Sequence, residues 1–279
     1  MSEGPREDGS WTFYFFDFDD NTMFLDTKVG LRNTHNGNEK LIGTHEFAAI
    51  RQFLGVPGVW EDYEIYEETY RFFRDKTAAA RAEDPVEYFV QDILEAIKDK
   101  ENKLWQAPSW DMFVHACTHQ RPVSIITARG HSQHTIKAGV KALVDSGLLS
   151  QEPNYLSIYA VSNEESRKSI LDSITNPEEL EAVRQMKDPT SDLKRHAIRQ
   201  TVDQALKDYG HDKPHRFGMS DDDPSNIDLI VKAMAECKHK HEDKRFFAIN
   251  THHGHHVKLE VYPIDVAVTK EIGVLDDIT

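Results

Sequence analysis

The sequence predicts an α/β fold in which a parallel sheet is flanked by helices. Three observations lead to this prediction. Short apolar runs end abruptly at polar residues, stretches with helical spacing lie between these runs, and acidic or hydroxyl side chains follow several of the runs directly. Continuous apolar runs of this kind are typical of strands that are buried on both faces. Strands that alternate with helices favour a doubly wound sheet.

The expected strands of this sheet cover residues 11–16, 122–126, 156–161, 216–219 and 245–250. The expected helices cover residues 110–119, 132–146, 192–209 and 224–237. In the second of them, Ile136, Val140 and Leu143 recur at the spacing of one helix face. Residues 164–192 are polar and helical in pattern, and residues 257–262 alternate as one further edge strand would.

Residues 23–108 do not follow the alternation of strands and helices. Segments 23–32 and 40–43 predict a β-hairpin with its turn at residues 36–38, and helices are expected near residues 45–53, 63–75 and 85–98. The aromatic stretch 60–73 could line a substrate cleft, although a place in a local core is the more common role of such residues. We therefore expect an inserted module over residues 23–108 and a main domain over residues 1–22 and 109–279.

The composition limits the classes of function. The chain has 279 residues and a formal net charge of −15, which argues against general binding to nucleic acids or anionic membranes. The two cysteines, Cys117 and Cys237, cannot form a disulfide framework. The acidic N-terminus does not look like a signal peptide, and the sequence has no apolar stretch of membrane-spanning length. We expect a cytoplasmic protein.

Polar side chains at the ends of the expected strands predict a ligand site. Ligands of doubly wound sheets bind at the carboxyl ends of the strands. Asp17 and Asp19 follow the first strand, Thr127 follows the second, and the acids of residues 221–223 follow the fourth. Carboxylates gathered in this way need a compensating cation, and oxygen ligands suit Mg²⁺. Taken alone, the acidic run after the first strand could also be a solvated turn.

In their order along the chain, these segments resemble the four motifs of the haloacid dehalogenase (HAD) superfamily of phosphohydrolases. Residues 15–21 resemble motif I, residues 125–127 motif II, Lys194 motif III, and residues 220–226 motif IV. The sequence departs from the pattern at Asn21, where Thr is usual, and at Ser220, where Gly is usual. Lys168 is the alternative for motif III. The resemblance implies a Rossmann-like core and a C1-type cap, helical with a β-hairpin, formed by the insert 23–108.

The resemblance also implies a role for each residue. Asp17 would be the nucleophile and Asp19 the general acid and base, while Thr127 and Lys194 would hold the phosphoryl oxygens. Mg²⁺ would be bound by Asp17, by the backbone carbonyl of Asp19, and by Asp221 or Asp222, between which the sequence does not decide. Further contacts to phosphate or substrate are expected from Asn21, Ala128 and Arg129, and Arg129 could instead pair with an acid of the insert.

The activity implied by the resemblance is Mg²⁺-dependent hydrolysis of a small phosphate monoester through an aspartyl-phosphate intermediate. An acid at Asp19 favours phosphate ester hydrolysis over carbon–halogen cleavage. Two alternatives stay open. One is a phosphotransferase or a nucleic-acid-end phosphatase, of which the net charge disfavours the second, and the other is a binding protein of this fold without turnover. The histidines of residues 252–256 could bind a metal, but a solvated loop is the favoured interpretation. The sequence does not indicate an oligomeric state.

Overall fold

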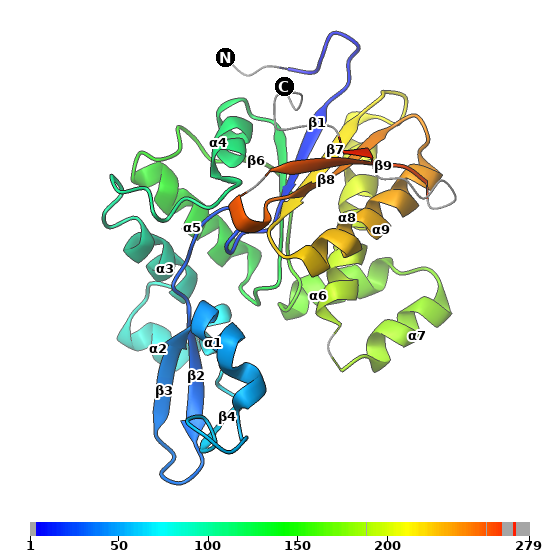
Figure 1. Cartoon of the computed structure of the whole chain (residues 1–279). Helices are drawn as coiled ribbons and strands as arrows, with labels where there is room; N and C mark the ends of the chain where they lie inside the picture. Colours follow the sequence, from blue (N-terminus) through cyan, green and yellow to red (C-terminus); the bar gives the residue numbers. More distant parts are fainter. Residues whose placement is uncertain (1–3, 188, 255, 264–269, 272–279) are drawn as a thin grey trace.

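The computed structural model describes residues 4–187, 189–254, 256–263 and 270–271 (Figure 1). Within these residues the main sheet has seven strands in the order β10-β9-β8-β7-β1-β5-β6. The strands from β6 to β8 are all parallel, whereas β9 and β10 run antiparallel to their neighbours. The bounds of the strands are Thr12–Phe16 for β1, Pro122–Thr127 for β5, Asn154–Ala160 for β6, Arg216–Asp221 for β7, Arg245–Asn250 for β8, Val257–Val261 for β9 and Lys270–Glu271 for β10.

The prediction of an α/β fold with a mostly parallel, Rossmann-like sheet is confirmed, and so are its five predicted strands. The predicted edge strand 257–262 exists as β9, but it is not at the edge, because β10 pairs with its outer side. Strand β1 lies in the centre of the sheet. Phe16 of β1 is in register with Ile125 of β5 on one side and with Ser220 of β7 on the other. This register brings the residues that follow β1, β5 and β7 to one edge of the sheet.

Helices cover both faces of the sheet, as predicted. On one face lie α8 (Thr190–Tyr209) and α9 (Pro224–Lys240), with α6 (Glu164–Ser173) and α7 (Pro177–Gln185) beyond them (Figure 1). On the other face lie α4 (Trp110–Thr118) and α5 (Gln133–Asp145), with α3 (Tyr88–Ala96) packed against α5. The helices predicted over residues 110–119, 132–146, 192–209 and 224–237 are therefore confirmed.

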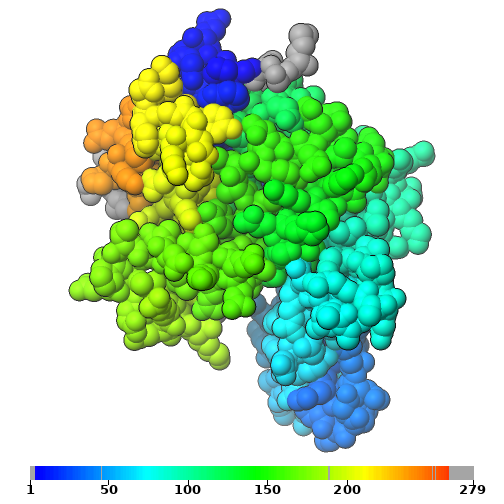
Figure 2. Space-filling view, turned by 180° about the vertical axis from the view of Figure 1, so that it is seen from behind, coloured from blue at the N-terminus to red at the C-terminus, as the bar shows by residue number. Residues whose placement is uncertain are grey.

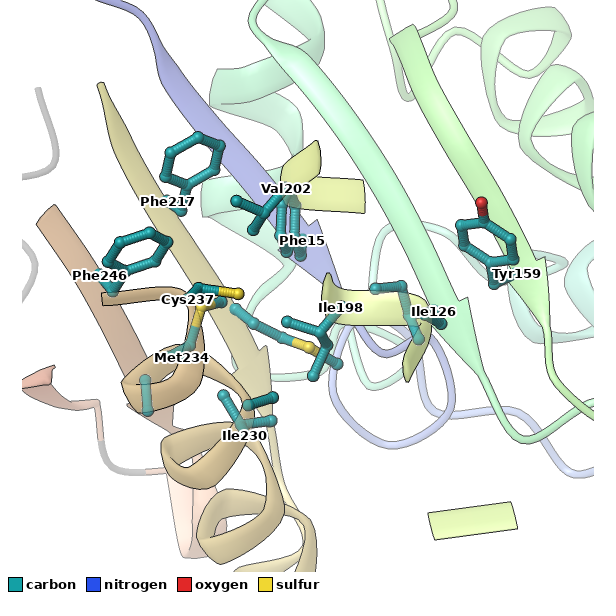
Figure 3. Close-up of a cluster of buried hydrophobic side chains, with 14 of the residues drawn as sticks. Phe15, Ile126, Tyr159, Ile198, Val202, Phe217, Ile230, Met234, Cys237 and Phe246 are labelled. Carbon is teal, nitrogen blue, oxygen red and sulfur yellow. The ribbon is translucent and has the colours of Figure 1, made fainter. Parts of the chain in front are cut away.

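Alternate side chains of β1 enter the two halves of the core. Phe13 and Phe15 belong to the cluster under α8 and α9, where Phe15 lies near Ile198 and Val202 (Figure 3). Tyr14 and Phe16 belong to the cluster under α4 and α5. Because successive residues of a strand point to opposite faces, a strand that is apolar at every position is stable only when both faces are covered.

Residues 28–83 form a smaller unit beside the main sheet. Its three-stranded sheet has the order β3-β2-β4, with β2 at Lys28–Asn33, β3 at Glu39–Gly43 and β4 at Tyr63–Glu64. Two short helices, α1 (Thr44–Ile50) and α2 (Ala78–Glu83), complete it. Its own core contains Val29, Leu31, Ile42 and Phe47. The predicted hairpin is confirmed, and its turn includes Gly37 at a φ of 72°.

The helix predicted over residues 63–75 is wrong. Tyr63 and Glu64 pair with β2 as strand β4, and the backbone N–H of Tyr66 donates to the hydroxyl of Thr69 (2.8 Å) in a turn. Only residues 71–73 form a helical turn, of the 3-10 type. The spacing of the aromatic residues suited a helix, but pairing with β2 satisfies the backbone of this segment instead.

The second cluster of the main core extends into the predicted insert. Met23, Phe89 and Trp105 are buried in the same cluster as Phe16 and Phe18. The helix predicted over residues 85–98 is confirmed as α3. The division of the chain at residues 22/23 and 108/109 stays a prediction. None of the helices in the described ranges combines the length and the apolar character needed to cross a membrane.

Candidate active site

A cleft of about 720 Å³ opens at the carboxyl ends of β1, β5 and β7. Its walls include most of the predicted site residues, namely Asp17, Asp19, Thr127, Ala128, Arg129, Lys194, Asp221 and Asp222. Seen from behind, the molecular surface is notched between the unit of residues 28–83 and the part that carries α6 and α7 (Figure 2). Lys168, the alternative to Lys194, is exposed on α6 and does not line the cleft.

Lys194 lies between two buried carboxylates. Its Nζ atom is 3.0 Å from Oδ1 of Asp17 and 3.3 Å from Oδ2 of Asp221. The lysine comes from the first turns of α8, and the acids follow β1 and end β7. Burial opposes the charge of Lys194, but the negative charges of Asp17 and Asp221 outweigh this effect, so the pKa of Lys194 is raised. The ammonium group therefore stays protonated and holds the two acids together.

Asp17, Asp221 and Asp222 form a cluster with an excess of negative charge. One carboxylate oxygen from each lies within 4.8 Å of the others. Burial, reinforced by the charge of Asp221, raises the pKa of Asp17 well above its usual value, although Lys194 opposes this. The same two causes raise the pKa of Asp222 to about 7. Three carboxylates facing one ammonium group fit a divalent cation with oxygen ligands, which would restore their ionised forms.

The adjacent acids Asp221 and Asp222 differ in how they are held. Asp221 is completely buried, and its Oδ1 accepts hydrogen bonds from Nδ2 of Asn226 (3.0 Å) and from the backbone N–H of Asp223 (3.1 Å). Its other oxygen faces Lys194. Asp222 belongs to the same cluster of possible ligand atoms. The geometry therefore offers both acids to a cation and fixes the orientation of Asp221 more firmly.

Asp19 is turned toward Arg129 by two hydrogen bonds. Nε of Arg129 donates to Oδ2 (2.7 Å), and an Nη atom donates to Oδ1 (2.6 Å). Such a bidentate pair holds the carboxylate close to the plane of the guanidinium group and so fixes its orientation. The carboxylate of Asp19 is not a member of the cluster formed by Asp17, Asp221 and Asp222.

Arg129 is almost completely buried, with 1% of its surface exposed. Its guanidinium group also donates to the hydroxyl of Thr27 (2.6 Å) and lies 3.7 Å from a carboxylate oxygen of Asp92. The rings of Phe73 and Phe89 lie 5.2 and 4.8 Å from its central carbon, within the range of cation–π attraction. Arg129 thus pairs with an acid of the predicted insert, and its predicted substrate contact stays a prediction.

Thr127 and Ala128 line the cleft together with the carboxylates. Thr127 ends β5 and is buried, and its hydroxyl oxygen accepts the backbone N–H of Arg129 at 3.4 Å. The next helix along the chain, α5, begins just beyond at Gln133. A hydroxyl and backbone N–H groups in this position can bind anionic oxygens.

Asn21 does not line the cleft, and instead lies buried beneath it. Its Nδ2 donates to the backbone oxygens of Asp17 (2.9 Å) and Ser220 (3.1 Å). Its Oδ1 accepts from the hydroxyls of Ser109 and Thr251, both at 2.8 Å. The side chain therefore joins the chain after β1 to the ends of β7 and β8. At this position, where the resemblance has a threonine, the amide of Asn21 makes the hydrogen bonds to the loop, while the predicted contact with substrate stays a prediction.

Several supporting residues were missed by the sequence analysis. The hydroxyl of Thr22 donates to the backbone oxygen of Asp17 (2.8 Å). Its position next to Asn21 in the sequence could have indicated a role in holding this loop. Thr251 follows β8 at the same edge of the sheet, so the strand-end argument could have found it. Ser109 carries no such signal, because it precedes a helix far from the motifs.

The histidine run contributes hydrogen bonds to loops. The Nδ1 of His252 bonds to the carbonyl oxygen of Asp222 (3.0 Å), and the Nε2 of His256 bonds to that of Pro108 (2.7 Å). His255 and the side chain of His253 lie outside the described residues. Within the described part of the chain, the aspartate cluster is the one group of three or more metal-binding side chains placed to share a cation.

Comparison with protein-family models, with curated proteins and with solved structures finds no match for this chain.

Proposed function

We propose that the protein is a phosphohydrolase of the HAD type, which hydrolyses a phosphate monoester through an aspartyl-phosphate on Asp17. One observation carries this proposal. Lys194 contacts Asp17 and Asp221 in a buried site, although it is 177 residues from the first and 27 from the second along the chain. Buried charges are costly unless they are paired, so a convergence of this kind at strand ends favours a functional site.

The proposed reaction has two steps. The carboxylate of Asp17 attacks phosphorus, the bond from phosphorus to the alcohol oxygen breaks, and the leaving oxygen takes a proton from Asp19. A water molecule then attacks the aspartyl-phosphate, gives its proton to Asp19, and releases inorganic phosphate with Asp17 restored. Lys194 and the groups at Thr127 and Ala128 would stabilise the charge on the phosphoryl oxygens.

Asp17, Asp221 and Asp222 are the residues that would hold the proposed Mg²⁺, with the backbone carbonyl of Asp19 as the further ligand implied by the resemblance. When bound, the cation would neutralise charge on the phosphoryl oxygens and on the carboxylates. The fit rests on the donor set, since hard divalent cations prefer carboxylate oxygens. The excess of three carboxylates over one ammonium group points the same way.

The proposed acid role of Asp19 requires a movement of its side chain. In the structure, both of its oxygens accept hydrogen bonds from Arg129, so the guanidinium group holds the carboxylate in place. Asp19 would have to rotate out of this pair to reach a leaving group. The side chain is 31% exposed and borders the cleft, which leaves room for such a rotation.

We further propose that residues 23–108 act as a C1-type cap over a small phosphorylated substrate. We also propose that the enzyme is cytoplasmic. Support comes from the cleft, whose walls combine strand-end residues with residues of this segment such as Phe47 and Tyr70. A cap that closes over a site excludes water from it. The acidic lining gives no support to a nucleic-acid substrate, whose phosphates need clustered positive charge.

A binding protein without turnover is the second candidate, and the pairing of Asp19 with Arg129 favours it.

Hydrolysis of p-nitrophenyl phosphate with and without Mg²⁺ distinguishes the phosphohydrolase from the binding protein. We expect Mg²⁺-dependent hydrolysis by the wild type, and a loss of at least about a thousandfold in Asp17→Asn, because a nucleophile is removed. Asp145→Asn is the matched control, since Asp145 is exposed on α5 and pairs with Lys141. Equal rates in wild type and Asp17→Asn would reject the proposal.

A further inference from the structure

The cleft is much larger than a phosphate group needs. Its volume of about 720 Å³ lies in the range of sites for whole small molecules. The carboxylate cluster occupies one part of the wall. Another part is apolar and comes from the segment of residues 25–73, with Leu25, Val29, Phe47, Tyr70 and Phe73. The leaving group of a phosphate ester bound at Asp17 would have this second part of the wall available.

Three aromatic rings in this wall form a continuous series. The rings of Phe47 and Tyr70 meet edge to face, with centroids 5.9 Å apart and planes at 85°. Those of Tyr70 and Phe73 meet in the same way at 6.2 Å and 75°. Phe47 belongs to the small core, and Phe73 packs against it. Tyr70 is 47% exposed and is not part of that cluster, so its position serves the cleft more than the core.

The charged side chains of the lining are predominantly acidic. Asp17, Asp19, Asp20 and residues 221–223 surround the strand ends, and Glu67 adds a further acid beside the aromatic rings. The basic residues that line the described cleft are each close to an acid: Arg74 to Glu68 at 2.7 Å, Arg129 to Asp19 and Lys194 to Asp17. A second anionic group on a ligand would therefore meet repulsion without a compensating cation.

We propose that the leaving group of the substrate carries an aromatic ring and no second anionic group, and that this ring packs against Tyr70 between Phe47 and Phe73. The inference rests on the proposed phosphohydrolase function. Rings that already offer faces and edges at near-perpendicular angles favour a further ring over an aliphatic group, by the geometry of aromatic pairs. The acidic lining excludes bisphosphates and phosphorylated carboxylic acids as good substrates.

A matched series of alkyl phosphates tests the proposal without changing the reactivity of the leaving group greatly. Benzyl phosphate carries a ring, cyclohexylmethyl phosphate replaces it with an aliphatic group of similar size, and 4-carboxybenzyl phosphate adds an anion. We expect kcat/KM for benzyl phosphate to exceed that for cyclohexylmethyl phosphate about fivefold. We expect 4-carboxybenzyl phosphate to be about tenfold worse than benzyl phosphate.

Variants of Tyr70 locate the preference. Tyr70→Ala is expected to bring the ratio of benzyl to cyclohexylmethyl phosphate close to one, and Tyr70→Phe is expected to retain it. Phe53→Ala is the control, since Phe53 is 50% exposed on the same segment but does not line the cleft. A ratio that is unchanged in a folded Tyr70→Ala would overturn the aromatic subsite, as would a wild-type ratio of one.

Binding of phosphonates separates this inference from the proposed function. Benzylphosphonate and cyclohexylmethylphosphonate cannot be hydrolysed, and calorimetry in the presence of Mg²⁺ measures their affinity for the wild type and the Tyr70 variants. Preferential binding of benzylphosphonate without hydrolysis of any ester would support the subsite and overturn the phosphatase. Hydrolysis with no preference for a ring would overturn the subsite alone.

Discussion

Asn21 shows how much a single buried amide can hold at this edge of the sheet. It is completely buried, and its two ends bond to Asp17, Ser220, Ser109 and Thr251. These partners come from four separate segments of the chain. The acids of the candidate site therefore depend on a residue that does not enter the cleft.

Replacing Asn21 with Leu keeps a similar volume but removes all of these hydrogen bonds. We expect the free energy of unfolding to fall by about 3 kcal/mol, because buried hydroxyls and carbonyls lose their partners. Urea denaturation measures the change. Asn102→Leu, at an exposed position, is the control and should change stability by less than about 0.5 kcal/mol. A loss in Asn21→Leu no greater than in the control would contradict the role assigned to this amide.

His131 carries a dependence of stability on pH. Burial, reinforced by the nearby charge of Arg129, lowers the pKa of His131 to about 3. Neither ring nitrogen has a hydrogen-bond partner among the described residues. The folded pKa lies below the unfolded value of about 6.5, so this residue contributes stability above about pH 6.5 that is lost as the pH falls toward 3.

We therefore expect His131→Gln to lose less stability than the wild type when the pH is lowered from 7 to 4. The difference between the two proteins should be about 3 kcal/mol, since each unit of pKa corresponds to about 1.4 kcal/mol. Urea denaturation at a series of pH values gives the free energy of unfolding of both proteins as a function of pH. The contributions of the other titrating groups are common to both proteins and cancel in the comparison. Parallel curves would show that His131 does not carry this dependence.

Among single residues, those at the ends of strands were predictable from the sequence. Asp17, Thr127 and Asp221 each end or follow a strand, so the sheet topology brings them together. Lys194 was predicted from the resemblance of the ordered segments to the HAD motifs. The partner of Arg129 was open, because the position of Asp92 depends on how α3 packs against α5, and nothing in the local sequence specifies that contact.

Among the elements, the strands of the parallel sheet were the most readable, since burial on both faces leaves a continuous apolar run. Residues 63–75 were misread because their regular aromatic spacing serves a short strand, a turn and part of the cleft wall instead of one helix face. Spacing alone does not distinguish these structures when a neighbouring strand can take up the backbone hydrogen bonds.

The contact between α3 and α5 depends on a glycine. A Cβ atom at Gly139 would collide with the ring of Phe89 and approach Cδ1 of Ile93 to 2.8 Å. Alanine favours a helix over glycine by about 1 kcal/mol. We nevertheless expect Gly139→Ala to destabilise the protein by about 1–3 kcal/mol, because Phe89 is fully buried and has little room to move.

Thermal and urea denaturation of Gly139→Ala measure this effect. The double variant Gly139→Ala with Phe89→Leu provides the control, since the smaller side chain leaves space for the new methyl group. Phe89→Leu should cost less stability when it is combined with Gly139→Ala than when it is made in the wild type. Additive effects of the two substitutions would mean that the collision is not the cause of the loss.

On the scale of the whole molecule, Arg129 connects the main sheet to the segment that lines the cleft. It pairs with Asp19 beside the sheet and with Asp92 of α3, and it packs against Phe73 of the smaller unit. We expect Arg129→Met to lower the free energy of unfolding by about 3 kcal/mol, because the two acids lose a buried partner.

Arg129→Met should also raise the rate of backbone amide hydrogen exchange, and more so in residues 28–83 than in β5 and β6. The reason is that the substitution weakens the link between the smaller unit and the main sheet. Arg32→Met is the control. Arg32 forms an exposed pair with Glu64, so its loss should cost less than about 1 kcal/mol. If exchange in residues 28–83 were the same in Arg129→Met as in the control, the smaller unit would be held by other contacts.

The central place of β1 in the sheet has a consequence for how the chain folds during synthesis. Its aromatic residues are synthesised before both of the strands that flank it, which begin at Pro122 and Arg216. Until β5 has been made, β1 has neither neighbour, and until β7 has been made it has only one. Pairing between strands that are far apart in the sequence slows folding and leaves partly folded intermediates that are prone to aggregate. We therefore expect the nascent chain to expose aromatic side chains of β1 until β7 has been made.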